Sequence, residues 1–159
     1  GSQPFHLTEH FNGWGPKPNP NNYTQDKVHA PIEARFVERN ITKEMVRAKM
    51  SPRRTCAAPI QTCVTRDLLE TAARLEPTYQ LYGQGGFADG DARGIAFSLD
   101  GLAAGASRLR EYVEAAWAQS TNVKVGFPSP ISPGEVESGK PIDSRTLLGI
   151  EKDLYGPRR

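Results

Sequence analysis

The placing of proline limits what this chain can fold into more than any other feature, because proline fixes the backbone angle φ and removes an amide donor. Between residues 13 and 23, three prolines alternate with residues that they push toward extended conformations. This stretch therefore cannot be helical. We expect residues 1–30 to form an extended Pro- and Asn-rich arm, in which Trp14 and Tyr23 supply side chains for docking. Such an arm either wraps its own domain or reaches a partner.

Other prolines mark where helices begin and end. Pro31 suits the first turn of a helix in which apolar residues recur at helical spacing, and Asn40 is a suitable left-handed stop for it. Thr42 is placed to cap a second helix, which closes at Pro52. The chain therefore predicts a pair of short helices joined by a turn.

The same pattern of cap and proline predicts two further helices. One is capped at Thr65 and closes at Pro77. The clearest helix covers residues 102–117, after a cap at Asp100, and it has a continuous apolar face. That face comprises Leu102, Ala106, Leu109, Val113 and Trp117.

Short apolar runs at residues 95–99 and 123–127 are the candidate strands. The chain thus predicts a helix-rich α+β fold, with a small core of about four helices and one or two short strands. This core takes residues 31–127. It is flanked by two extended Pro-rich arms: residues 1–30, and residues 128–159, which form a Pro/Gly-rich linker and a short C-terminal helix.

Length and charge exclude several broad classes. The 159 residues suit one domain with arms, and a net charge of +2 does not by itself indicate nucleic acid or membrane. No uncharged apolar run approaches the roughly 20 residues of a membrane span, so we expect a soluble chain. The Gly-Ser start without Met is typical of a cleaved expression tag, which predicts an excised domain.

No metal or cofactor is expected from the residue pattern. Cys56 and Cys63 would lie about 10.5 Å apart on one helix, too far for a disulfide, whereas in a loop they could pair. Without a CxxC spacing or a nearby His they make a poor zinc site, and we favour two reduced thiols. Residues 6–10 match the HxxEH spacing of inverted zinc peptidases, but Gly13 ends any helix there too soon for that fold.

A longer pattern lies between residues 29 and 46. A His-Ala pair at residues 29–30 precedes Arg-Phe-Val-Glu-Arg-Asn-Ile-Thr-Lys-Glu-Met-Val at residues 35–46. It resembles a segment of small bacterial ribonuclease toxin domains, in which His-Ala precedes Arg-Met-x-Glu-Arg-Gly-Ile-Thr-x-Glu-x-Val. Here five residues instead of three separate the His from the Arg, and the strands that follow in such toxins are not evident. The resemblance implies a toxin-like domain of a larger secreted protein, with a neutralising protein partner.

The residue types in this segment suit RNA cleavage. Attack by the ribose 2′-hydroxyl needs a base that works near neutral pH, and histidine is the usual choice. Cations must stabilise the charged phosphate, and Arg forks match phosphate oxygens. We therefore predict a metal-independent ribonuclease site in which His29 is the base and Arg35, Arg39 and Lys43 are the cations.

Positive charge is also concentrated beyond this segment. Residues 43–66 hold six Lys and Arg against one acidic residue, Glu44, which leaves a local net charge of +5. Such a concentration predicts a surface for RNA phosphates. The predicted nucleic-acid-binding residues are Arg47, Lys49, Arg53, Arg54 and Arg66.

A non-catalytic function stays open beside this one. A helix-rich core with two Pro-rich arms is typical of an interaction or assembly subunit, since extended arms make wide contacts. The aromatic side chains that would dock such arms are Trp14, Tyr23, Phe127 and Tyr155. A helix-turn-helix that reads DNA is a further alternative, although its turn lacks the usual small residues. The expected partners are thus RNA and a protein, either neutralising or assembling.

Overall fold

The computed structural model describes most of the chain, namely residues 2–15, 18–53, 56, 59–126 and 130–142. The chain divides into two compact units, Gly1–Tyr112 and Val113–Arg159. None of the described helices is both long and apolar enough to cross a membrane. The predicted C-terminal helix, which starts at residue 144, lies outside the described residues.

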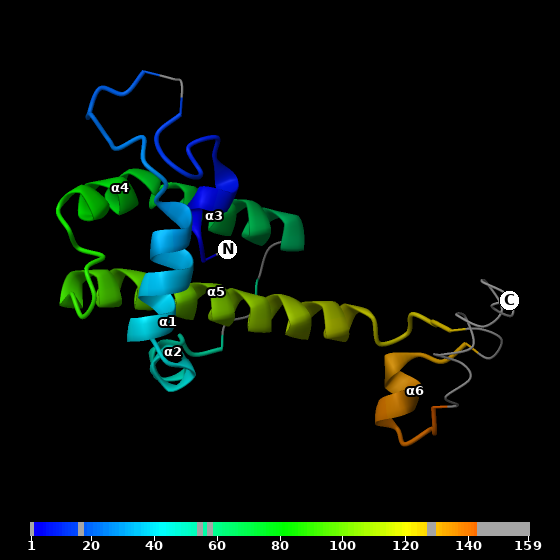
Figure 1. The fold of residues 1–159 in the computed structure, drawn as a ribbon. Helices are drawn as coiled ribbons and strands as arrows, with labels where there is room; N and C mark the ends of the chain where they lie inside the picture. Colours follow the sequence, from blue (N-terminus) through cyan, green and yellow to red (C-terminus); the bar gives the residue numbers. More distant parts are fainter. Residues whose placement is uncertain (1, 16–17, 54–55, 57–58, 127–129, 143–159) are drawn as a thin grey trace, which may run out of the picture. The chain divides into compact units, whose positions relative to one another are not determined.

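The predicted helix-rich fold is confirmed (Figure 1). A short 3₁₀ turn, η1, lies in the N-terminal arm, and a π-helical segment, η2, continues directly into α1. Four longer helices follow among the described residues, the last of which continues into the second unit. The elements are η1 (Pro4–Leu7), η2 (Pro31–Phe36), α1 (Val37–Asn40), α2 (Lys43–Lys49), α3 (Ile60–Ala72), α4 (Leu75–Gly83) and α5 (Ala92–Gln119).

The two predicted strands are not found among the described residues. Residues 95–99 lie inside α5, and Val125 meets Ile131 only through an isolated bridge with hydrogen bonds of 3.0 and 2.9 Å. A five-residue apolar run cannot be assigned to strand or helix by periodicity alone. Here a helix that starts upstream carries the first run, so the β part of the predicted fold was wrong.

The local signals that predicted the first two helices were right. η2 begins at Pro31, α1 ends at Asn40, and the Thr42 hydroxyl accepts a hydrogen bond from the Met45 amide (3.3 Å) at the start of α2. Asn40 does not adopt the predicted left-handed backbone. Its side chain instead donates to the Phe36 carbonyl (2.8 Å), which satisfies one of the carbonyl groups left free at a helix end.

The predicted starts of the later helices were wrong. Thr65 lies inside α3 and Asp100 lies inside α5, so neither caps a helix. α5 begins instead where the Asp91 carboxylate accepts a hydrogen bond from the Arg93 amide (2.8 Å). Pro77 lies in the first turn of α4, where proline is tolerated, and does not end α3.

The N-terminal arm packs onto its own unit. Phe5, Tyr23 and Val28 are buried in one hydrophobic cluster with Ile32 and Tyr79. These five residues come from the arm, from η2 and from α4, so burial of apolar surface joins segments that are far apart in the sequence. Of the two alternatives for the arm, the structure realises the first, because the arm wraps its own domain.

Tyr79 attaches the arm to α4. Its hydroxyl donates to the His10 carbonyl (2.8 Å) and accepts from the Gly13 amide (3.1 Å), and both hydrogen bonds are buried. The Trp14 ring packs edge-on against the Tyr79 ring, with centroids 5.3 Å apart. Burial raises the pKa of the Tyr79 hydroxyl above its ordinary value. Trp14 and Tyr23, the two aromatic residues predicted to dock the arm, therefore pack against its own core.

α5 lies close to the turn after α4 at Gly94. A Cβ atom at this position would lie 2.0 Å from the Gly86 carbonyl oxygen and 2.7 Å from the Phe36 ring, so only glycine fits. The Phe36 ring packs edge-on against Phe87, with centroids 5.3 Å apart. The approach of Gly94 to the Phe36 ring places the start of α5 against the end of η2.

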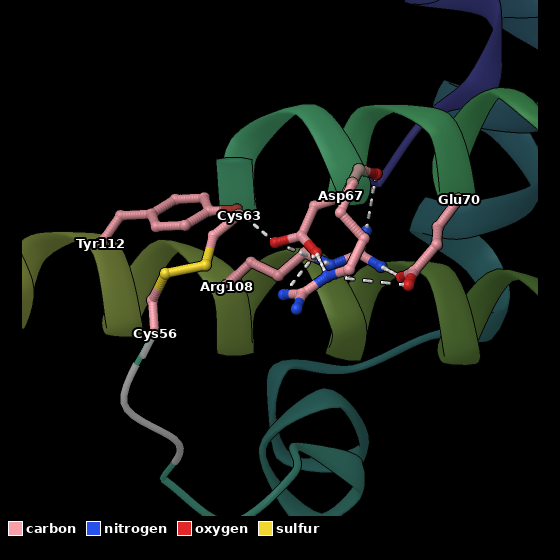
Figure 2. The surroundings of a disulfide bond; sticks show 7 residues. Cys56, Cys63, Asp67, Glu70, Arg108 and Tyr112 are labelled. Carbon is pink, nitrogen blue, oxygen red and sulfur yellow. Dashed lines mark hydrogen bonds and ion pairs between the residues drawn. A yellow bond between two sulfur atoms is a disulfide. The ribbon is translucent and has the colours of Figure 1, made fainter. Parts of the chain in front are cut away.

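Cys56 and Cys63 form a disulfide, with Cα atoms 6.4 Å apart (Figure 2). The predicted pair of reduced thiols was therefore wrong. Cys63 lies in the first turn of α3, but Cys56 precedes the helix. The helical separation that argued against pairing does not apply when one cysteine lies in the preceding loop.

The second unit contains a short helix, α6 (Pro133–Glu137), within the predicted linker. A capping box starts it: the Ser132 hydroxyl accepts from the Glu135 amide (3.3 Å), and the Glu135 carboxylate accepts from the Ser132 amide (2.9 Å). Lys140 donates to the same carboxylate (2.7 Å). The hydrogen bond from Lys140 is the largest cause that lowers the pKa of Glu135 to about 2.

Candidate functional site at His6, His29 and Glu33

The structure brings His29 together with His6 and Glu33 at the surface of the first unit. His29 Nε2 lies 3.2 Å from His6 Nε2, and His6 Nε2 lies 3.7 Å from Glu33 Oε2. His29 Nε2 and Glu33 Oε2 are in direct contact. Three chemically active atoms, from residues 27 positions apart at the extremes, thus face one another.

Each of the three side chains is placed by a buried neighbour or by a helix. His6 follows Phe5 in η1, and Phe5 is almost fully buried. His29 follows Val28, which is fully buried, and its amide donates to Asn12 Oδ1 (3.2 Å). Glu33 lies in η2, four residues after His29, a spacing at which side chains on a helical segment meet. The cluster is therefore built on the core that docks the arm.

The arrangement fixes which ring nitrogens are free for chemistry. A carboxylate only accepts hydrogen bonds, so the contact with Glu33 is made by a protonated Nε2 of His29. The lone pair of that ring then lies on Nδ1, which has no hydrogen bond among the described residues. Side-chain exposures of 57% for His6, 21% for His29 and 46% for Glu33 leave the cluster open to solvent.

The cations predicted to act with His29 lie elsewhere. Arg35 follows Glu33 by two residues, about half a helical turn around the segment. Arg39 lies near the end of α1, where it pairs with Asp89 (3.9 Å), and Lys43 starts α2. Among the described residues, no hydrogen bond or ion pair links any of these three cations to the cluster.

Two predicted RNA-binding cations are paired with acids. Lys49 lies 3.1 Å from Asp100, and Arg66 lies 3.1 Å from Asp67 and 3.9 Å from Glu70. These acids come from α3 and α5, outside residues 43–66 on which the charge count was made. The fold therefore lowers the local positive charge that the sequence predicted.

The other predicted RNA-binding residues are solvent-exposed or outside the described chain. Arg47 is exposed on α2, one turn after the exposed Lys43, so the two cations share a face of that helix. Arg53 is exposed in the loop that follows α2. Arg54 lies outside the described residues.

The HxxEH match at residues 6–10 does not form a zinc-peptidase arrangement. η1 ends at Leu7, so the five residues do not share one helix. The His10 ring is buried and stacks on Trp14, with centroids 4.1 Å apart, while its Nδ1 accepts from the Gly15 amide (2.9 Å). His10 therefore belongs to the core of the arm, and His6 turns to His29 instead.

A second charged site was missed by the sequence analysis. Asp67 is buried on α3, where Tyr112 donates a hydrogen bond to its carboxylate (Figure 2). Arg108 lies 3.6 Å from the same carboxylate and donates to Glu70 (2.5 Å). Burial, and then the hydrogen bond to Asp67, raise the pKa of Tyr112 to about 12. The network joins α3 to α5.

This network borders a pocket of about 680 Å³. Its walls carry both signs of charge and the disulfide, and it lies within the first unit. The lining residues are Lys49, Ser51, Cys56, Cys63, Arg66, Asp67, Glu70, Asp100, Ala104, Ser107, Arg108, Glu111 and Tyr112. The only sequence signals were that Asp67 and Glu70 share a face of one helix and that Arg108 and Tyr112 share a face of another. Neither spacing shows that the two helices pair.

No protein-family model matches this chain, and no curated protein or solved structure matches it. The resemblance of residues 29–46 to ribonuclease toxin domains is thus neither supported nor opposed by a relative. The function must be argued from the side chains that the fold brings together.

Proposed function

We propose that this chain is a nucleic-acid-directed domain that cleaves RNA without a metal, using His29 and His6 as its acid–base pair. The observation that carries the proposal is the convergence of two imidazoles and a carboxylate at an exposed position of the first unit. Cleavage by the ribose 2′-hydroxyl needs one group that takes a proton and one that returns it, and a pair of histidines suits both roles near neutral pH.

In this proposal His29 is the base, and Glu33 is its positioning residue. The carboxylate contacts Nε2 of His29, which orients the ring, leaves the Nδ1 lone pair free, and stabilises the imidazolium that forms. Nδ1 takes the proton of the 2′-hydroxyl while the 2′-oxygen attacks phosphorus. The bond from phosphorus to the 5′-oxygen then breaks.

His6 serves as the acid. In its protonated form it carries positive charge beside the phosphate, and it gives a proton to the departing 5′-oxygen. The products are a 2′,3′-cyclic phosphate and a 5′-hydroxyl, so no water or cofactor is consumed in this step. His29 leaves the step protonated and His6 neutral, and solvent restores both.

The remaining predicted cations bind the RNA strand at phosphates other than the one that reacts. Lys43 and Arg47 share one face of α2, and neither has an ion pair among the described residues. Arg39 is paired with Asp89 at 3.9 Å, but both side chains are exposed, and such pairs open at little cost. These cations bind neighbouring phosphates of the strand, so their loss weakens binding more than catalysis.

Incubation of the folded chain with total RNA in EDTA tests the proposal. We expect fragments that end in cyclic phosphates, with a bell-shaped dependence on pH, and at least about a hundredfold loss of rate in His29→Ala and His6→Ala. Arg39→Ala should retain cleavage but bind RNA more weakly. Glu38→Gln, which removes an exposed acid from the same helical segment, is the matched control. Intact RNA after incubation with the folded parent chain would refute the proposal.

An interaction subunit is the second candidate, favoured by apolar side chains left exposed on the first unit. Leu69 on α3 is 67% exposed and Leu109 on α5 is 64% exposed. The N-terminal arm supports this candidate less, because Trp14 packs into its own core. Light scattering of the purified chain, beside a Leu69→Ser and Leu109→Ser double variant, tests it. If the parent chain and the double variant are both monomers, the exposed leucines do not mediate self-association.

A further inference from the structure

We propose that His6, His29 and Glu33 together form a binding site for a divalent transition metal ion, with Zn²⁺ as the best fit. The inference goes beyond acid–base catalysis, because it concerns the three atoms that face inward in the cluster. Those atoms are His6 Nε2, His29 Nε2 and Glu33 Oε2, all within 4.8 Å of one another.

The separations suit a tetrahedral ion. Zinc binds imidazole nitrogen and carboxylate oxygen at about 2.0–2.1 Å, so neighbouring ligand atoms around a tetrahedral ion lie about 3.4 Å apart. The two Nε2 atoms are 3.2 Å apart, and His6 Nε2 is 3.7 Å from Glu33 Oε2. The third pair is closer than this, and a rotation of the half-exposed Glu33 side chain opens it.

The cluster presents three electron-pair donors to one shared space. Glu33 only accepts hydrogen bonds, and each imidazole presents the same nitrogen, Nε2, to that space. With the proton on Nε2 of His29, the Glu33 carboxylate and the Nε2 lone pair of His6 both face that single proton. A cation can take the place of this proton, because it accepts the lone pairs of all three atoms at once when the His29 proton moves to Nδ1.

The scaffold holds the ligands in place. His29 and Glu33 are four positions apart, with Pro31 between them at the first turn of η2. His6 is held by the burial of Phe5, whose ring packs against both Tyr79 and His29, with centroids 5.6 and 5.5 Å apart. Metal sites gain affinity when their ligands are fixed by such surroundings.

The kind of metal follows from the ligands. Two imidazoles and one carboxylate favour Zn²⁺ and its transition-metal neighbours over Mg²⁺ and Ca²⁺, which prefer oxygen ligands alone. Three protein ligands leave a fourth position, and the exposure of His6 opens that position to solvent. The site therefore has an open coordination position, unlike structural sites in which four protein ligands enclose the ion.

Calorimetric titration of the full chain with ZnCl₂, after removal of metal with EDTA, tests the site. We expect one ion per chain and an affinity at least about tenfold lower in His6→Ala and in Glu33→Gln. Substitution by Co²⁺ should give the visible absorption of a tetrahedral centre in the parent chain only. Glu38→Gln is again the matched control, and circular dichroism verifies that each variant is folded. Absence of binding by the folded parent, or equal binding by the His6→Ala chain, would overturn the proposal.

One consequence of the site rests on the proposed ribonuclease function. Zinc occupies the Nε2 atom of both histidines, so these nitrogens can no longer carry a proton, and RNA cleavage should stop when zinc is added after the EDTA has been removed. The two proposals fail separately. Zinc binding without cleavage under any condition refutes the ribonuclease and leaves the metal site, whereas cleavage without zinc binding does the reverse.

Discussion

The two hydrogen bonds of Tyr79 make the docking of the N-terminal arm measurable. Tyr79→Phe keeps the ring in its buried cluster but removes the hydroxyl that bonds the His10 carbonyl and the Gly13 amide. Each buried backbone group left without a partner costs about 1–3 kcal/mol, so the loss of two partners should lower the free energy of unfolding by about 2–6 kcal/mol. For a chain of this size that corresponds to a melting temperature lower by about 4–24 °C.

Urea unfolding followed by circular dichroism gives the free energy, and its slope against urea should not change. Tyr82→Phe is the matched control, because Tyr82 packs against the same cluster and its hydroxyl has no hydrogen bond among the described residues. We expect a change within about 0.5 kcal/mol for this control. Limited proteolysis should cut the arm faster in Tyr79→Phe alone. If the two variants lose equal stability, the buried hydrogen bonds are not what docks the arm.

Three further predictions follow from the packing, the disulfide and the charged network. Gly94→Ala should destabilise the fold by about 1–3 kcal/mol, since the new Cβ atom would meet the Gly86 carbonyl. Gly83→Ala is the control in the same urea assay, and it should change stability little because the space around Gly83 is open. Replacement of both cysteines by serine should cost about 2.5 kcal/mol by loop entropy, and a reducing agent should then no longer alter the unfolding midpoint. The pKa of Tyr112 is raised to about 12 in the folded chain, so folding favours its neutral form. Its contribution to stability is therefore present below pH 10 and is lost between about pH 10 and 12. In Tyr112→Phe, the free energy of unfolding measured against pH should no longer show this loss.

Sequence signals succeeded where the structure depends on a few neighbouring residues. Pro31 starts a helical segment and Thr42 caps α2 through its own hydroxyl, and both features need only local geometry. The prediction that Asp100 caps a helix was wrong for the converse reason. Asp91 already starts a helix upstream, and that helix continues through Asp100 and through Gly101, a residue that usually weakens a helix.

Charge was harder to predict than helices, because a count along the chain ignores what the fold brings near. The concentration at residues 43–66 contained only one acid, Glu44, but Lys49 meets Asp100 from α5. Arg66 instead pairs with Asp67, the next residue along the chain, which the count left out because it stopped at residue 66. The local positive charge therefore depends both on where the count ends and on helix pairing, and only the pairing of Lys49 with Asp100 could not be read from neighbouring residues.

Sequence patterns also could not predict which residues meet in the candidate site. His29 and Glu33 are four positions apart, but the sequence analysis placed His29 in the extended arm and did not pair it with Glu33. His6 lies 23 residues before His29 and joins it only because the arm folds back. What folds the arm back is burial of Phe5 and the hydrogen bonds of Tyr79, which are tertiary contacts. Local opening of the arm would therefore remove His6 and leave His29 with Glu33 in place. The chemistry of the site, whether it moves protons or binds a metal, is for this reason tied to the stability of the arm and not to that of the helices alone.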